Sequence, residues 1–357
     1  MKVVYIASVT SYAGKSLAAL GIGLCLRERG YKVGYFKPVG SLPAEAKGTM
    51  TDEDALFISQ RLDPAAPVEA LCPVLLTEEL TSRAFAGKLE PLDSKIRDAL
   101  SRVAKGKDVV LAGGLGDLSR GALFGLCAPA VAELLDARAL IVANYKGDST
   151  VEDVILARQV LGNRFLGLVF NSAAAQHMEH LSEQAKPHLE ARGLAVLGVL
   201  PQDEVIGSVT ARELAQYLGA KVLAGEKGLG ELIKRFVVGA MSVSSAIRYF
   251  RDMHDKAVIT GGDRPDIQLA ALQTSTRALV LTGNLYPSAP LIQRANQLGV
   301  PILLVGDDTL ATVGHIEDAM GRLRVRGETK VQRAKELMEE HFDLDRFASL
   351  LGLKKRS

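Results

Sequence analysis

Short, continuous apolar runs alternate with helical patterns along this 357-residue chain, and this alternation restricts the fold more than any other feature. Runs such as Val3–Ala7, Ala139–Ala143 and Leu166–Asn171 are apolar throughout, or nearly so, and each is followed by a helical pattern. Strands that are apolar on both faces are typical of a parallel sheet covered by helices on both sides. Right-handed crossovers then connect the strands into a doubly wound fold. The sequence therefore predicts an α/β protein.

The alternation loosens between Pro201 and Gly230, where glycines gather, and then restarts on a smaller scale. We place a domain boundary in this stretch. Residues 1–215 are predicted to form the doubly wound domain, and residues 216–357 a second, smaller α/β domain with a C-terminal helical segment. In that segment, residues 330–340 alternate in charge, which indicates a solvated helical face.

The charge balance and the apolar content restrict the partners of the chain. Lys plus Arg number 43, Asp plus Glu number 41, and aromatic residues make up 5% with no Trp. This composition gives no electrostatic reason to expect nucleic acid as a partner. Three cysteines in apolar stretches indicate reduced, buried thiols. No run approaches the ~18 apolar residues of a membrane span, and the N-terminus lacks a signal-peptide cleavage pattern. We therefore expect a cytoplasmic protein without a membrane partner.

A phosphate-binding loop is predicted between the first strand and the first helix, at Ala13-Gly14-Lys15-Ser16. Such a turn directs backbone N–H groups and a helix N-terminus at an anion. Lys15 is expected to reach the β- and γ-phosphates, and Ser16 to bind Mg²⁺. The full pattern G-x-x-x-x-G-K-[ST] is not met, because Val9 occupies the first glycine position. A plain strand-to-helix turn is the alternative. The predicted nucleotide-binding residues are Thr10, Ser11, Tyr12, Ala13, Gly14, Lys15, Ser16 and Asn171.

Polar residues at other strand ends extend this candidate site. Lys37 closes the second predicted strand, at the edge where α/β sheets bind ligands, and with Ser41 is a candidate for a phosphate or a substrate carboxylate. A solvated lysine is the alternative. Asp54 is a candidate second Mg²⁺ ligand, or simply one of the acids enriched at a helix start. Asn171 ends a strand, where it either hydrogen-bonds a base edge or caps the strand.

The glycine cluster after the strand at Val109–Leu111 lacks an expected acid. In P-loop ATPases this strand end carries the acidic residue that holds the metal. Here the equivalent position is Ala112, and Asp117 lies five residues further on. The missing carboxylate predicts weak or no ATP hydrolysis, so the sequence leaves open whether the protein is an enzyme.

Taken together, these segments resemble dethiobiotin synthetase. That family has Gly at the position of Ser8, Thr at the position of Ser16, and the segment Val-Glu-Gly-Ala-Gly-Gly where this chain has Ala112 in place of the glutamate. The matching segments, in the same order as in the family, are Ser8–Ser16, Lys37-Pro38-Val39, Asp54-Ala55-Leu56, Val109–Gly116 and Val169-Phe170-Asn171. The resemblance implies a P-loop NTPase-like fold that binds ATP with Mg²⁺, in a family that joins a carboxyl group to an amine.

The second half is similar to the DRTGG domain, through Val237–Ser242 and Thr260–Asp266. That domain follows a dethiobiotin-synthetase-like module in long phosphotransacetylases. Leu197–Pro201 and Thr210–Leu214 match the linking region of the same enzymes. The resemblance implies a freestanding counterpart of their N-terminal regulatory half. A phosphotransacetylase or another enzyme of acyl metabolism is then a candidate partner.

The turn Gly261–Asp266 is the candidate effector site of the second domain. A tight turn after a strand directs Arg264 at the carboxyl edge of the sheet, where it would bind an anionic effector together with Asp263 and Asp266. The alternative is a capped turn with an intramolecular Arg–Asp pair.

Three functions remain open from the sequence. The first is a regulatory or sensor protein that binds a nucleotide with Mg²⁺ and hydrolyses it slowly or not at all. The second is an ATP- and Mg²⁺-dependent carboxylate–amine ligase of the dethiobiotin synthetase type. The third is a non-catalytic assembly module. An open sheet edge in the small domain would favour self-association, so a homo-oligomer is expected.

Overall fold

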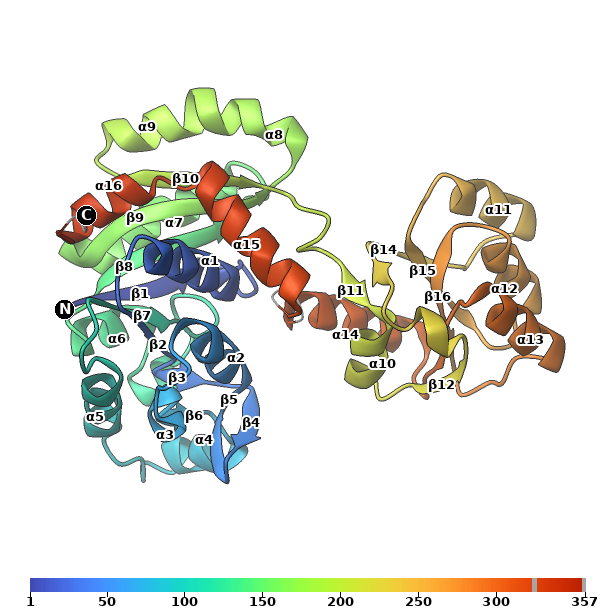
Figure 1. The fold of residues 1–357 in the computed structure, drawn as a ribbon, viewed down its shortest axis with the longest axis horizontal. Coiled ribbons are helices and arrows are strands. Elements are labelled where there is room, and N and C mark those ends of the chain that lie inside the picture. Colours follow the sequence, from blue (N-terminus) through green and yellow to red (C-terminus); the bar gives the residue numbers. More distant parts are fainter. Residues whose placement is uncertain (323–325, 355–357) are drawn as a thin grey trace. The chain divides into compact units, whose positions relative to one another are not determined.

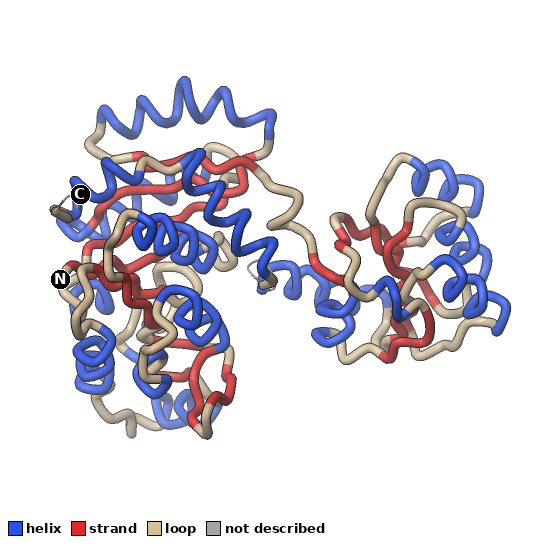
Figure 2. Tube along the Cα trace, viewed as in Figure 1, coloured by secondary structure: helices blue, strands red, loops and turns tan. Residues whose placement is uncertain are grey.

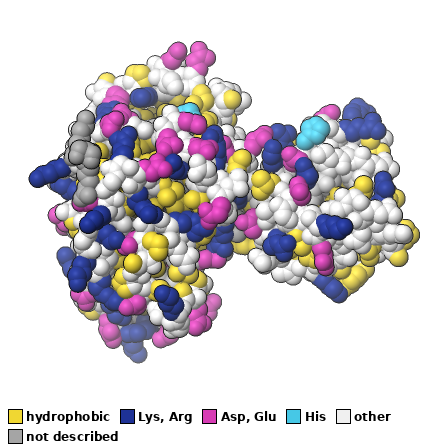
Figure 3. All heavy atoms as spheres, in the orientation of Figure 1, with side chains coloured by type: hydrophobic (Ala, Val, Ile, Leu, Met, Phe, Trp, Pro, Cys, Tyr) yellow, Lys and Arg dark blue, Asp and Glu magenta, His cyan; other side chains and the backbone are white. Residues whose placement is uncertain are grey.

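The computed structural model describes residues 1–322 and 326–354 and divides into two compact units. The first unit comprises Met1–Gln202 and Gly327–Ser357, and the second comprises Asp203–Arg326. Each unit has a central sheet flanked by helices (Figures 1 and 2). Along the part of the chain that the structure describes, no helix has the length and apolar character needed to cross a bilayer. Basic and acidic side chains are interspersed on the visible face of the first unit (Figure 3).

The first unit is built on a six-stranded sheet whose neighbouring strands are all parallel. The strand order is β10-β9-β8-β1-β7-β2. The central strand pairs Ile6 with Gly113 on one side and with Leu140 on the other, so the strands end at a common carboxyl edge. The strands are β1 (Lys2–Ser8), β2 (Val33–Phe36), β7 (Val109–Gly113), β8 (Arg138–Asn144), β9 (Phe165–Ala173) and β10 (Val196–Pro201).

Helices cover both faces of this sheet. Val3, Tyr5 and Ala7 of β1 belong to one core with residues of α5, α6 and α7, while Val4 and Ile6 are fully buried on the opposite face. The helices of this unit are α1 (Lys15–Glu28), α2 (Glu53–Leu62), α5 (Asp93–Val103), α6 (Ala128–Leu134), α7 (Ser149–Leu161), α8 (Ala175–His180), the π-helix η3 (Leu181–Ala185), α9 (Lys186–Ala191), α15 (Glu328–His341) and α16 (Leu344–Leu351).

Short strands and helices outside the six-stranded sheet complete the first unit. A hairpin of β4 and β5 is antiparallel, and β3 pairs in parallel with β6. These elements are β3 (Val39–Gly40), β4 (Pro43–Ala46), β5 (Thr49–Asp52), α3 (Val68–Leu71), β6 (Val74–Leu75), α4 (Glu78–Phe85), η1 (Ala122–Phe124) and η2 (Gly162–Arg164).

The C-terminal helical segment packs on the first unit, which differs from the assignment of residues 216–357 to one domain. Helix α15 lies against α1, and a Cβ on Gly21 would come within 2.6 Å of the Ala334 carbonyl oxygen. Helix α15 carries charged residues between 330 and 340, but the same stretch also contains an apolar stripe that includes Ala334, Leu337 and Met338, all buried. An amphipathic stripe must be covered by another element. Here α1 covers the stripe, and the absence of a side chain at Gly21 lets the two helices approach closely.

The second unit has a smaller five-stranded sheet in the order β12-β17-β16-β15-β14. Its strands are parallel except for β12, and apolar cores fill both faces. The main elements are α10 (Ala211–Tyr217), β12 (Lys221–Ala224), β14 (Arg235–Val238), α11 (Val243–Arg251), β15 (Lys256–Gly261), α12 (Pro265–Leu272), β16 (Thr276–Thr282), α13 (Ala289–Leu298), β17 (Ile302–Leu304) and α14 (Thr309–Arg322). The minor elements are β11 (Val209–Thr210), η4 (Glu226–Gly228) and β13 (Leu232–Ile233).

The predicted fold class is therefore confirmed: the protein is α/β, with a parallel central sheet in the first unit and a smaller α/β unit after it.

Candidate functional site

The predicted phosphate loop connects β1 to α1 and turns on Gly14. Gly14 caps the helix with φ 99° and ψ 22°, a left-handed conformation that L side chains rarely adopt. A Cβ at this position would also lie 2.2 Å from the side-chain nitrogen of Asn171. Both the backbone conformation and the lack of space require glycine here. The turn therefore presents the N-terminus of a 14-residue helix at the carboxyl edge of the sheet.

Lys15 is the first residue of α1, and its ammonium group contacts neutral oxygens. It donates to Ser8 Oγ at 2.7 Å and to the carbonyl oxygen of Gly116. Ser8 Oγ also lies 2.8 Å from the carbonyl oxygens of Thr10 and Gly116, so it joins the loop to the segment after β7. Burial, reinforced by the positive charge of Lys37, lowers the pKa of Lys15 to about 8. No carboxylate hydrogen-bonds this cation in the part of the chain that the structure describes.

Ser16 and Asp54 come together next to the phosphate loop. The Ser16 hydroxyl donates to Asp54 Oδ2 at 3.1 Å. The structure thus brings together the two predicted Mg²⁺ ligands, from α1 and from the first turn of α2. A hydroxyl and a carboxylate are hard oxygen donors, and Mg²⁺ in nucleotide sites is held by one or two protein oxygens, phosphates and water. This donor set fits Mg²⁺.

Lys37 is held by Asp52, a partner that the sequence reasoning did not assign to the site. Its ammonium lies 2.9 and 3.0 Å from the two carboxylate oxygens of Asp52, and 3.6 Å from Asp54. Burial alone would lower the pKa of Lys37, but the charges of Asp54 and Asp52 outweigh burial and raise it. Asp52 is completely buried and also accepts four backbone N–H bonds, from Ser41, Leu42, Asp54 and Ala55. The signal that could have identified it is the position of Asp52 directly before α2, where an aspartate caps a helix.

The other predicted nucleotide-binding residues surround the loop. Asn171, at the end of β9, donates its side-chain N–H to the Ala13 carbonyl oxygen at 2.8 Å, so its donor supports the loop backbone. Ala13 is fully buried, Thr10 is half-buried, and Ser11 and Tyr12 are exposed. The Ser41 side chain is exposed, and only its backbone N–H reaches the Lys37–Asp52 pair.

The end of β7 carries no carboxylate. Ala112 is completely buried in the core, so its side chain lies among apolar groups. Asp117 accepts hydrogen bonds from the backbone and hydroxyl of Ser119 and from the backbone of Arg120. Burial, which raises the pKa of Asp117, is outweighed by these hydrogen bonds, which hold it below its usual range. The loop after β7 therefore supplies the Gly116 carbonyl oxygen to Lys15, and its nearest acid is fixed within its own turn.

The candidate effector residues of the second unit lie at the carboxyl end of β15. Arg264 donates to both oxygens of Asp266, at 3.1 and 3.0 Å, and to the Met241 carbonyl oxygen at 3.2 Å. Asp263 is exposed. The intramolecular Arg–Asp pair, one of the two interpretations of this turn, is thus present in the structure. The Gln268 side chain stabilises the turn by donating hydrogen bonds to the carbonyl oxygens of Gly261 and Gly262.

Comparison with known families agrees with the division of the chain into two units. A family model described as an AAA domain matches residues 2–210, and the DRTGG domain model matches residues 213–319. The chain therefore belongs to the AAA domain family and carries a DRTGG domain after the P-loop module. The resemblance drawn from the sequence motifs is confirmed.

Curated relatives with the same arrangement are phosphate acetyltransferases. That of Nitratidesulfovibrio vulgaris is 28% identical and is matched over 99% of this chain and 52% of its own length. That of Synechocystis is 23% identical, over 97% and 51% respectively. The chain thus spans about half the length of these relatives.

Two solved structures are similar to parts of this chain. The MinD cell division protein of Aquifex aeolicus is 15% identical, with a TM-score of 0.34, over 57% of this chain and 83% of that one. The CBS and DRTGG domains of the regulatory region of Clostridium perfringens pyrophosphatase are 17% identical, with a TM-score of 0.30, over 47% and 85%.

Proposed function

We propose that this protein is a nucleotide-binding regulatory or sensor protein that binds ATP at Gly14, Lys15 and Ser16. The observation that carries the proposal is Lys15, a cation at a helix N-terminus that is held by neutral oxygens rather than by a carboxylate. A triphosphate would replace those oxygens and add a favourable charge interaction that neutral oxygens cannot provide. Thr10, Ser11, Tyr12 and Ala13 would form the wall of the phosphate site, with Asn171 supporting it.

Magnesium would accompany the nucleotide, held by Ser16 and Asp54. When bound, the ion would neutralise charge on the β- and γ-phosphates. The residues of the chain then have separate tasks. Ser16 and Asp54 offer two oxygens 3.1 Å apart, and Lys37 keeps a positive charge 3.6 Å from Asp54. Lys37, with Ser41 nearby, would face the terminal phosphate or a second substrate.

Slow or absent hydrolysis follows from the end of β7. The metal-binding acid of active P-loop ATPases is replaced by the buried Ala112, and Asp117 is fixed by Ser119 and Arg120. Without that acid, the developing charge in the transition state lacks one of its usual stabilising groups. ATP would therefore stay bound without being hydrolysed, or would be hydrolysed only slowly, as a sensor requires.

The relatives suggest what such a sensor would serve. The chain matches about half of each phosphate acetyltransferase, so a phosphotransacetylase, or another enzyme of acyl metabolism, is the partner we propose. The second unit would receive the signal, with an anionic effector that displaces Asp266 from Arg264 as a further input. We place this function in the cytoplasm, in a homo-oligomer that associates through a sheet edge of the second unit.

Isothermal titration with ATP in Mg²⁺ tests the proposal. Wild type and Lys105→Ala, which removes an exposed lysine on another surface, should bind ATP with equal affinity. Lys15→Ala should weaken binding about 10- to 100-fold, because hydrogen bonds to charged groups are worth about 1.5–3 kcal/mol. Phosphate release by wild type should not exceed that of Lys15→Ala. Absence of ATP binding by wild type would refute the proposal.

A carboxylate–amine ligase is the second candidate, favoured by one observation. Lys37, Asp54 and Ser16 lie together as an ATP-dependent ligase would need them. Such a ligase would release phosphate only when a carboxylate, or CO₂, and an amine are both present. A panel of amines with bicarbonate and ATP distinguishes it from the sensor, because the sensor shows no dependence on the amine.

A further inference from the structure

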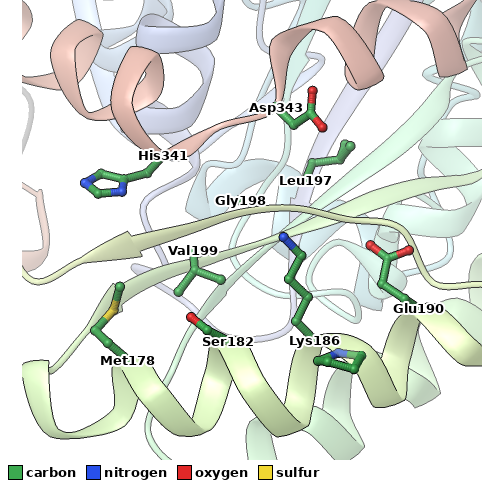
Figure 4. Close-up of a pocket in the computed structure, with 10 residues that line it drawn as sticks. Met178, Ser182, Lys186, Glu190, Leu197, Gly198, Val199, His341 and Asp343 are labelled. Carbon is green, nitrogen blue, oxygen red and sulfur yellow. The ribbon is translucent and has the colours of Figure 1, made fainter.

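A groove lies along the outer edge of the first sheet, away from the phosphate loop. It has a volume of about 490 Å³ and separates the helical segment 175–191 from the edge strand β10. Figure 4 shows the side chains of Met178, Ser182, Lys186 and Glu190 on this helical segment, spaced four residues apart. The π-helix Leu181–Ala185 lies in this row, and such segments frequently occur at functional sites. Volumes of about 300–1,000 Å³ are typical of small-molecule sites.

Lys186 supplies the groove with a positive charge. Its side chain extends from α9 toward β10, with its ammonium in the space between helix and strand (Figure 4). Across residues 1–322 and 326–354, it makes no hydrogen bond and no salt bridge within 4 Å. The Ser182 hydroxyl, one turn earlier, likewise has no hydrogen-bond partner in that part of the chain. A cation and a hydroxyl on one helical face are therefore free to bind a ligand.

The two carboxylates at the rim are already bound to other groups. Glu190 accepts two hydrogen bonds from Arg346, at 2.6 and 2.7 Å, and one from the backbone of Val196 at 2.8 Å. The Arg346 guanidinium, helped by the Val196 N–H, outweighs burial and lowers the pKa of Glu190. Asp343 caps α16 by accepting from the Arg346 backbone. Arg346 is thus the hydrogen-bonded partner of Glu190, and Lys186 interacts with Glu190 only through its charge, at a longer distance. Among the described residues, the Lys186 ammonium therefore keeps its hydrogen-bond donors for a ligand.

The rest of the groove is apolar. Met178 from the helix and Val199 from β10 point toward each other across it, whereas Leu197 lies on the other side of β10 (Figure 4). The backbone of β10 is partly closed on this side, because Asp343 donates its N–H to the Leu197 carbonyl oxygen at 2.7 Å. An added peptide strand would have to displace that contact, whereas a small molecule would not. The groove therefore favours a small ligand over a polypeptide.

We propose that this groove binds a small organic anion with an apolar segment, its anionic head on Lys186 and Ser182 and its tail against Met178 and Val199. The head is a carboxylate or a phosphate, since an ammonium and a hydroxyl bind either. None of the residues that line the groove belongs to the phosphate-loop site, so this second site is independent of the nucleotide.

Isothermal titration of the full chain tests the assignment with defined probes. These are butyrate, hexanoate, hexyl phosphate, inorganic phosphate and the neutral hexanol. We expect hexanoate or hexyl phosphate to bind, hexanol to bind about tenfold more weakly, and inorganic phosphate to lack the gain from the tail. The stronger of the two hexyl ligands identifies the head group.

Variants then locate the binding. Lys186→Met should weaken binding of the hexyl anions about tenfold or more, whereas Lys95→Met, at an exposed position on α5, should not change it. Ser182→Phe, at an exposed position, should block the groove without loss of thermal stability. Lys15→Ala should leave this binding intact even if the nucleotide proposal fails. Absence of binding by wild type, or binding that survives both Lys186→Met and Ser182→Phe, would overturn the assignment.

Discussion

The two units place a cation at the same kind of position but leave it with different amounts of free charge. In the first unit, Lys15 follows the carboxyl end of β1 and is held by the neutral oxygens of Ser8 and Gly116. In the second unit, Arg264 follows the carboxyl end of β15 and is paired with Asp266 through two hydrogen bonds. Both turns contain glycine, and both lie at the sheet edge where α/β proteins bind ligands.

This difference shows that topology and composition do not suffice to identify an anion site. A ligand at Lys15 exchanges neutral oxygens for phosphate, whereas a ligand at Arg264 must first displace a carboxylate. Under the proposed function, the first exchange should favour a triphosphate, because it adds a charge interaction that the neutral oxygens do not provide. The second requires an anion that binds arginine better than Asp266 does.

The largest expected effect concerns the buried ion pair behind the phosphate loop. Asp52→Asn removes the completely buried carboxylate that hydrogen-bonds Lys37 and leaves Asp54, 3.6 Å away, as the remaining nearby counter-charge. We expect a loss of about 3 kcal/mol in the free energy of unfolding, because the buried Lys37 then keeps only the more distant Asp54 as a counter-charge and four backbone N–H groups lose their charged acceptor. Urea denaturation measures this loss.

Two controls sharpen that result. Asp98→Asn, at an exposed position, should leave the free energy of unfolding unchanged. Lys37→Met in the Asp52→Asn background should recover part of the loss, since the stranded cation is gone. If Asp52→Asn costs no more than Asp98→Asn, the pair does not stabilise the fold.

A smaller effect is expected from the turn itself. Gly14→Ala forces a Cβ toward Asn171, 2.2 Å from its nitrogen, and demands φ 99° of an L residue. Strain of this kind costs about 1–3 kcal/mol, and relief by movement of the loop would disrupt the phosphate site. ATP titration should show lost binding together with a lower melting temperature. Gly48→Ala, also at positive φ but with open space around it, should destabilise without affecting ATP binding.

Lys15 should make nucleotide affinity pH-dependent. Its pKa without bound nucleotide is about 8, so the ammonium loses its proton above that pH. Bound phosphates favour the protonated form, so binding must take up a proton at higher pH. Affinity should therefore fall up to about tenfold per pH unit above pH 8, and this lysine should add no pH dependence well below it.

Lys15→Arg provides the comparison, because a guanidinium stays protonated over this range. Whatever the affinity of Lys15→Arg for ATP at pH 7, loss of a proton from residue 15 should not lower it between pH 8 and pH 9.5. A wild-type affinity that stays constant over the same interval would mean that Lys15 does not bind the phosphates in its charged form.

The smallest effect is expected at the second sheet edge. Asp266→Asn breaks an exposed ion pair, which solvent screens, so the melting temperature should not change measurably. The variant should instead free Arg264 for anions. Titration with diphosphate should show tighter binding to Asp266→Asn than to wild type, and Arg264→Ala should abolish the difference. A stability loss as large as that of Asp52→Asn would contradict the contrast between the two edges.

The alternation of apolar runs and helical patterns was enough to predict the α/β class, because a period of two or of 3.6 residues is a local property. The motif Gly14-Lys15-Ser16 likewise predicted the phosphate loop from neighbouring residues. The sequence assigned the C-terminal segment to the second domain, whereas in the structure this segment belongs to the first unit and packs on α1. One of these contacts joins Cys25 and Lys335, which are 310 residues apart along the chain. Such a contact leaves no local signal.

Charge pairing within the sites was decided by the tertiary structure. The sequence placed Lys37 and Asn171 at strand ends, Asp54 at the start of a helix and Arg264 in a turn after a strand, because these positions can be predicted from local patterns. Which cation is neutralised depends on distances of 3–4 Å between residues from different elements, and these are set by packing. Asp52 illustrates the point: the sequence shows a helix-capping acid, and only the folded chain places it against Lys37.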